Sequence, residues 1–267
     1  MGQKSNPNSF QKQDLNAKLW STQSKKDYSL LLRNNFEMTE NIRSLFERNN
    51  CLVKECIFLR SKETNLGTLF ISFLPVFLRK KNAGWANTSF GTARIVNLLF
   101  NLIANFGYLS EKRIVFLNLD YIGSKTKKKF QNSESLKPLL IFKNEIFYSS
   151  GLTIFFLLFS IKNMTPLLTK YIARYFKLLH RTKKINKFLL FLSRFVTLVE
   201  KSSFYGSRVK GVKFQIKGRF NGVPRSKTRV FEKGRIPLQT IASKINYSLC
   251  HINTSYGVFS IKVWLYE

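Results

Sequence analysis

The residue types that carry most enzyme and metal chemistry are scarce in this chain of 267 residues. Its three cysteines and two histidines have a spacing that does not match a tetrahedral zinc site: Cys51, Cys56, Cys250, His180 and His251. The Asp and Glu residues are scattered and form no obvious pair for acid–base or two-metal work. No GxSxG, HExxH or GxxxxGK[ST] motif occurs. We therefore expect no enzyme activity, no cofactor, no metal site and no small-molecule substrate.

The chemistry that the chain does offer is electrostatic. It has 45 Lys and Arg against 14 Asp and Glu, a formal net charge of +31. Like charges at this density repel one another, so a polyanionic partner is expected. Nucleic acid is the first candidate and an anionic membrane surface the second. The most apolar run, Gly151 to Ile161, is far shorter than the ~20 residues of a spanning helix, and we interpret it as a buried segment.

The sequence pattern predicts an α+β protein with four parts: a basic polar arm at 1–38, a first domain at 39–122, an insertion or linker at 123–165 and a carboxyl-terminal domain at 166–267. In the first domain, Thr39 can cap a short helix that ends near Arg48. Apolar runs then predict three strands and one further helix, at 52–60, 68–76, 113–119 and 92–106.

In the carboxyl-terminal domain, cations recur at helical spacing after Pro166. Steps of four and three residues place five of them along one helix stripe: Lys170, Arg174, Lys177, Arg181 and Lys184. Leu168, Ile172, Tyr175 and Leu179 give the same helix an apolar face. A solvated charged face is the ordinary alternative, but the absence of interleaved acids favours contact with phosphate.

Strict alternation predicts a strand at 211–219. Val212, Phe214 and Ile216 would face the core, and Lys213, Gln215 and Lys217 would face outward. A turn is predicted at Asn221-Gly222, and a closing strand at 258–266 with the inward residues Phe259, Ile261, Val263 and Leu265. Eight cations lie between Gly211 and Arg235, with Glu232 the only acid. We therefore predict a small twisted sheet with one basic face.

Short motifs occur in a distinctive order at both ends of the chain. The chain opens with MGQKSNPNSF. Its last sixty residues contain, in order, Lys210-Gly211-Val212-Lys213, Gly218-Arg219, Gly222, Lys227-Thr228, Gly234-Arg235-Ile236-Pro237-Leu238, Ile245-Asn246-Tyr247, Thr254-Ser255-Tyr256-Gly257-Val258 and Lys262-Val263-Trp264. The opening and this ordered set resemble the family of bacterial and organellar small-subunit ribosomal protein three.

The resemblance implies a prokaryotic-type KH domain at 39–122, followed by helices packed on a small sheet. A KH domain clamps nucleotides with a GXXG loop. The corresponding stretch, Arg79 to Gly91, lacks that loop because Gly84 and Gly91 lie too far apart. The KH-like domain is therefore expected to be degenerate and to serve as a scaffold.

The resemblance further implies a structural protein in the head of the small ribosomal subunit, near the site where mRNA enters. Its partners would be small-subunit rRNA, mRNA and neighbouring head proteins. The expected rRNA-binding residues are Lys210, Lys213, Lys217, Arg219, Arg225, Lys227, Arg229, Lys233 and Arg235. The residues expected at the mRNA channel are Arg174, Lys177, Arg181, Lys183, Lys184 and Lys187.

Composition also suggests a compartment. The family motif begins at Met1, and abundant Phe, Lys, Asn and Ile with few Ala suggest an AT-rich genome. We therefore expect an organelle-encoded protein of the mitochondrial ribosome, with a plastid or an AT-rich bacterium as the alternative. A free organellar RNA-binding factor, such as a splicing helper or a translational activator, is the competing function.

Overall fold

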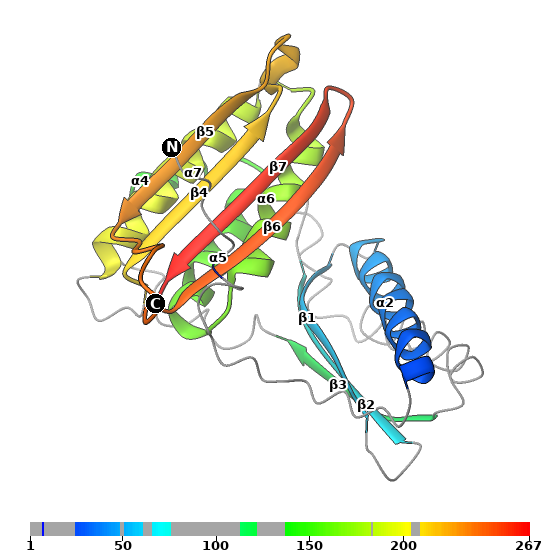
Figure 1. The fold of residues 1–267 in the computed structure, drawn as a ribbon. Helices are drawn as coiled ribbons and strands as arrows, with labels where there is room; N and C mark the ends of the chain where they lie inside the picture. The colour runs from blue at the N-terminus through cyan, green and yellow to red at the C-terminus, as the bar shows by residue number, and fades with distance from the viewer. Residues whose placement is uncertain are drawn as a thin grey trace. The chain divides into compact units, whose positions relative to one another are not determined.

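The structure, a computed structural model, describes Pro7 and residues 25–48, 51–60, 66–75, 113–121, 137–182, 184–203 and 209–267. The chain forms two compact units (Figure 1). One comprises Asp14–Ser124, and the other comprises Met1–Gln13 with Lys125–Glu267. Each unit combines helix with sheet, so the predicted α+β class is confirmed.

The first unit contains helix α2 (Lys25–Arg48) and strands β1 (Cys51–Arg60), β2 (Leu66–Pro75) and β3 (Arg113–Tyr121). The sheet order is β1-β2-β3, with β1 and β2 antiparallel and β2 and β3 parallel. Ile42 and Phe46 are buried one turn apart on α2, and the Phe46 ring lies 5.2 Å from that of Phe73 on β2. This apolar contact holds the helix against the sheet.

The three predicted strands of this unit are confirmed to within two residues at each end. Helix α2, however, begins at Lys25, inside the predicted arm. The Thr39 hydroxyl donates to the Phe36 carbonyl within the helix, at 2.9 Å, instead of capping a new one. Ion pairs at helical spacing, Arg33–Glu37 and Arg43–Glu40, support the longer helix. The predicted helix at 92–106 and the stretch Arg79 to Gly91 lie outside the described residues.

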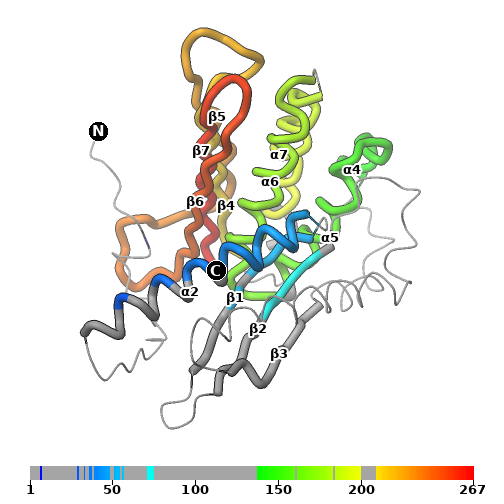
Figure 2. The backbone as a smooth tube through the Cα atoms, turned by 90° about the vertical axis from the view of Figure 1, so that its right-hand side faces the viewer, coloured from blue at the N-terminus to red at the C-terminus, as the bar shows by residue number. Residues whose placement is uncertain are grey.

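The second unit is a two-layer structure in which helices cover one face of a four-stranded antiparallel sheet (Figures 1 and 2). The sheet order is β5-β4-β7-β6. The helices are α4 (Lys137–Leu140), α5 (Tyr148–Ser160), α6 (Thr165–Leu179) and α7 (Lys184–Ser203). The strands are β4 (Gly211–Gly218), β5 (Lys227–Gly234), β6 (Ile245–Thr254) and β7 (Gly257–Tyr266), with the 3-10 turn η4 (Phe220–Gly222) between β4 and β5.

The core between these layers confirms the predicted inward faces. All the residues assigned to the inner sides of β4 and β7 and to the apolar face of α6 are buried: Val212, Phe214, Ile216, Phe259, Ile261, Val263, Leu265, Leu168, Ile172, Tyr175 and Leu179. The predicted turn is also present, with Asn221 and Gly222 at φ of 54° and 75°. Period-two and helical spacing therefore identified the core of this unit correctly.

The predicted linker is different in the structure, because its described residues are packed into the second unit. Phe147, Ile154 and Leu157 are fully buried. The Tyr171 hydroxyl of α6 donates to the Phe147 carbonyl at 2.8 Å, and burial holds the pKa of Tyr171 well above its usual value. The run 151–161 is a buried segment, as predicted. Within the described residues, no helix combines the length and apolarity needed to cross a bilayer.

Replacement of Gly151 by alanine tests whether α5 belongs to this core. A Cβ there would lie 2.5 Å from the Phe191 Cζ and 2.7 Å from the Tyr171 hydroxyl. In a packed core we expect a loss of about 1–3 kcal/mol in the free energy of unfolding. In a loose linker helix the same change would stabilise by about 1 kcal/mol. Urea unfolding of the full chain measures the sign, with Ser149→Ala on the exposed side of α5 as the control.

Candidate nucleic-acid interface

Charge in the second unit is polarised along the strands. One end of the sheet is formed by the last residues of β4, turn η4, the first residues of β5 and the β6–β7 turn. Near this end, Lys217 is opposite Thr228 on β5 and Ser260 on β7. We call this end the basic end. It carries five of the predicted rRNA-binding cations, all exposed: Lys217, Arg219, Arg225, Lys227 and Arg229. Both described carboxylates of the sheet region, Glu232 and Glu267, lie toward the opposite end.

At that opposite end, predicted RNA-binding cations are engaged within the protein. The Lys213 ammonium forms an ion pair with Glu232 across β4 and β5 and lies 6.0 Å from the centre of the Trp264 ring. The Lys210 ammonium lies 5.1 Å from the centre of the Tyr266 ring. Lys233 and Arg235 are exposed, and both closely follow Glu232 in sequence. This end therefore offers phosphate a weaker field than the basic end.

The predicted single basic face is not what the structure shows. Residues directly opposite in an antiparallel pair point to the same side, and Lys227, Arg229 and Lys233 are opposite Gly218, Ile216 and Val212. They therefore lie on the helix side of the sheet, whereas Lys213 and Lys217 lie on the outer side. The β5 cations are exposed because β5 is an edge strand. The cations surround an end and an edge instead of covering a face.

The predicted cationic helix stripe is broken between Leu179 and Lys184. Helix α6 ends at Leu179 because two side chains lie at the carbonyls of its last turn. The Thr182 hydroxyl donates to the Leu179 carbonyl at 2.9 Å, and His180 Nδ1 lies 2.8 Å from the Lys177 carbonyl. Of the residues predicted for the mRNA channel, Arg174 and Lys177 are on α6, Arg181 is in the turn, and Lys184 and Lys187 are on α7. Lys183 lies outside the described residues.

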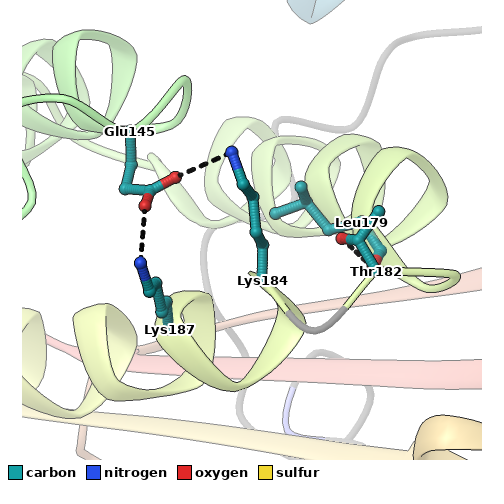
Figure 3. A network of polar contacts seen from close by, with 5 residues as sticks. All are labelled: Glu145, Leu179, Thr182, Lys184 and Lys187. Carbon is teal, nitrogen blue, oxygen red and sulfur yellow. Dashed lines mark hydrogen bonds and ion pairs between the residues drawn. The ribbon is translucent and has the colours of Figure 1, made fainter.

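A single acid holds two of those cations. Glu145, in the connection between α4 and α5, accepts ion pairs from Lys187 at 3.2 Å and Lys184 at 3.7 Å (Figure 3). Its side chain is only 14% exposed, whereas the two lysines are more than half exposed. Sequence spacing did not reveal this contact, because its members are about forty residues apart. Glu145 therefore competes with any phosphate that approaches Lys184 and Lys187.

The described residues offer no cluster of metal ligands. No group of three or more His, Cys, Asp or Glu side chains within them could hold a metal ion. Cys51, Cys56 and Cys250 are not joined in disulfide bonds. The second unit therefore offers cations and aromatic rings, which are the groups that proteins use to bind nucleic acid.

Replacing Glu145 by glutamine should strengthen RNA binding. Exposed ion pairs contribute about 0–1 kcal/mol, so we expect affinity to rise about two- to five-fold at low salt. Release of two lysines should also steepen the slope of log affinity against log salt concentration. The slope should change by as much as about 1.4 if both lysines contact phosphates of a single strand. A filter-binding series with the full chain measures both quantities. Glu40→Gln, which removes the surface pair with Arg43, is the matched control, and equal changes in both variants would contradict the assignment.

Comparisons with known proteins match the carboxyl-terminal part of the chain. A family model described as "Ribosomal protein S3, C-terminal domain" matches residues 195–265, from late α7 through β7. The chain is 48% identical over 59 residues to "Small ribosomal subunit protein uS3c" of Anthoceros angustus, covering 22% of this chain and 27% of the relative. It is 47% identical over 58 residues to "Small ribosomal subunit protein uS3" of Aquifex pyrophilus, covering 22% and 25%. The chain thus matches about a quarter of the length of these relatives.

The relatives also correct the expected compartment. They are uS3c proteins, the chloroplast type, from algae and plants such as Chlorokybus atmophyticus and Marchantia polymorpha, together with uS3 proteins of bacteria. They point to a plastid or bacterial ribosome, and the mitochondrial prediction is wrong. Its basis was residue composition, which reflects nucleotide bias and not cellular location. Residues 195–265 of this chain therefore match the carboxyl-terminal domain of the ribosomal protein S3 family.

Proposed function

We propose that the chain is a structural, non-catalytic protein of a small ribosomal subunit, and that its basic end binds rRNA. The observation that carries the proposal is the segregation of charge on a domain of the S3 family. Residues 137–267 contain 24 Lys and Arg but only four Glu. The two of these acids that lie on the sheet side are toward the end away from η4. Five exposed cations at one end can neutralise several phosphates and release their counterions.

We infer that the first unit is a degenerate KH-like domain that acts as a scaffold. The order helix, strand, strand, then a third strand parallel to the second supports this. A parallel neighbour requires a crossover connection, as the element order of a KH domain does. The missing GXXG pattern at 79–91 argues against nucleotide clamping by this unit.

We further propose that the domain lies in the head of the subunit, beside the channel that admits mRNA. Arg174, Lys177 and Arg181 would meet successive phosphates of the entering strand. Lys183, Lys184 and Lys187 would also contact phosphate once the ion pairs of Lys184 and Lys187 with Glu145 are broken. The ribosome in question would be of plastid or bacterial type, with neighbouring head proteins as further partners.

Co-sedimentation tests the assignment against a free RNA-binding factor. A structural protein should remain with small subunits in sucrose gradients through a moderate salt wash, because many phosphate contacts must release together. A splicing helper or translational activator would return to the top of the gradient. Tagged chain expressed in a plastid or bacterial host with its own copy depleted provides the material.

Charge reversal should locate the rRNA contact. Changing Lys217, Lys227 and Arg229 together to Glu replaces phosphate attraction with repulsion at the basic end, and we expect at least a ten-fold loss of incorporation into subunits. Reversal of Lys210, Lys233 and Arg235 at the opposite end makes the same change in net charge and serves as the control. Equal loss in both triple variants would mean that total charge, and not the basic end, determines assembly.

A further inference from the structure

Three turns converge at the basic end of the second unit. The α6–α7 turn contacts the β6–β7 turn, where His180 Nε2 lies 3.1 Å from the Ser255 Oγ and Arg181 Nε donates to the same oxygen at 3.4 Å. The rings of His180 and Tyr256 meet edge to face with centres 5.9 Å apart. Turn η4 completes the group, because a Cβ on Gly222 would lie 3.3 Å from the Tyr256 ring. We call these residues the three-turn corner.

The hydrogen bonds of the corner have one consistent direction. A carbonyl can only accept, so the 2.8 Å contact of His180 Nδ1 with the Lys177 carbonyl makes Nδ1 the donor. In a neutral imidazole, Nε2 is then the acceptor, and the Ser255 hydroxyl donates to it. The Ser255 oxygen in turn accepts from Arg181 Nε. Arg181 is thus held through Nε, and its terminal nitrogens can form the paired hydrogen bonds that suit a phosphate.

The corner also has an aromatic surface and space beside it. Tyr256 is half-buried, and Gly222 lets its ring approach the η4 backbone closely. At the neighbouring Gly257, a Cβ would meet no atom within 4 Å. Exposed cations also lie on the elements that lead into the three turns: Lys177 on α6, Lys217 on β4 and Arg219 before η4. A ring with a fixed arginine beside it and cations on the adjoining elements is suited to a nucleotide of a single strand, whose base is free to stack.

We propose that the three-turn corner binds one nucleotide of single-stranded RNA, with Arg181 on the phosphate and Tyr256 stacked on the base. His180 and Ser255 are positioning residues that orient Arg181. The assignment rests on the RNA-binding function proposed above and adds to it a subsite with a base contact. Charge alone would bind single strands and duplexes by phosphate, whereas this subsite favours an unpaired nucleotide.

Binding of the full chain to a fluorescein-labelled oligouridine and to a duplex RNA of the same length tests the subsite. We expect Tyr256→Leu to weaken single-strand binding about ten-fold, as the loss of one stacked base would, with no change in salt slope or duplex affinity. Tyr256→Trp should retain binding. Tyr148→Leu, which changes a half-buried tyrosine at the start of α5, is the matched control and should have no effect.

The arginine part of the subsite has its own readout. Arg181→Ala should lower affinity and reduce the salt slope by about 0.7, the share of one single-strand phosphate. Ser255→Ala keeps the charge but frees the guanidinium, so it should cost affinity in the native chain and nothing further in the Arg181→Ala background. Additive effects of the two changes would overturn the positioning role.

The outcomes separate the two proposals. Native single-strand affinity in Tyr256→Leu, with a steep salt slope retained, overturns the subsite and leaves the proposed function in place. A flat salt dependence in the native chain overturns the proposed function itself. If Tyr256→Leu does not fold, an azidophenylalanine in place of Asn253, exposed near the end of β6, decides the question in assembled subunits. Crosslinks to unpaired nucleotides support the subsite, and crosslinks to paired RNA or protein alone overturn it.

Discussion

Repulsion among cations is the constraint on which the second unit depends. Residues 137–267 contain four glutamates and 24 Lys and Arg, so the glutamates are too few to form an ion pair with every cation. The described pairs are therefore placed where they also fix structure. Glu232 joins β4 to β5, and Glu145 joins the α4–α5 connection to α7. The exposed cations of β5 and of the basic end lie at an edge and an end of the sheet, which is also where a polyanion can reach them.

An aromatic core supplies the cohesion that opposes this repulsion. Phe147 lies at its centre, with ring centres of Phe188 and Phe191 each 5.1 Å away and that of Tyr175 at 6.3 Å. Such ring pairs contribute about 0.5–1.5 kcal/mol each beyond their buried area. Since Phe147 comes from the stretch before α5, the helices α6 and α7 reach their full packing only with that stretch in place. The packing therefore explains why the segment predicted as a linker is part of the unit.

Patterns within one element were predictable from the sequence, and relations between elements were not. Alternation identified the strands β4 and β7 and their buried residues, because a half-buried strand must alternate. The register between β4 and β5 cannot be seen in either strand alone, so the cations of β5 were expected on the wrong side of the sheet. The spacing of cations also predicted one continuous helix across His180 and Arg181. Spacing could not show where α6 ends, because the contacts that end it are local hydrogen bonds and contacts with the β6–β7 turn. His180, Ser255 and Tyr256 gave no signal as site residues.

The cations of β5 have a consequence for the life of the protein before it meets RNA. A strand at the edge of a sheet presents unpaired backbone groups that invite pairing with another chain. On β5, Lys227, Arg229 and Lys233 recur on one side of that edge, and nearly every residue is exposed. A second copy that approached edge to edge would bring the same charges into register with these. These cations therefore disfavour self-association of newly made chains through β5 until a polyanion neutralises them.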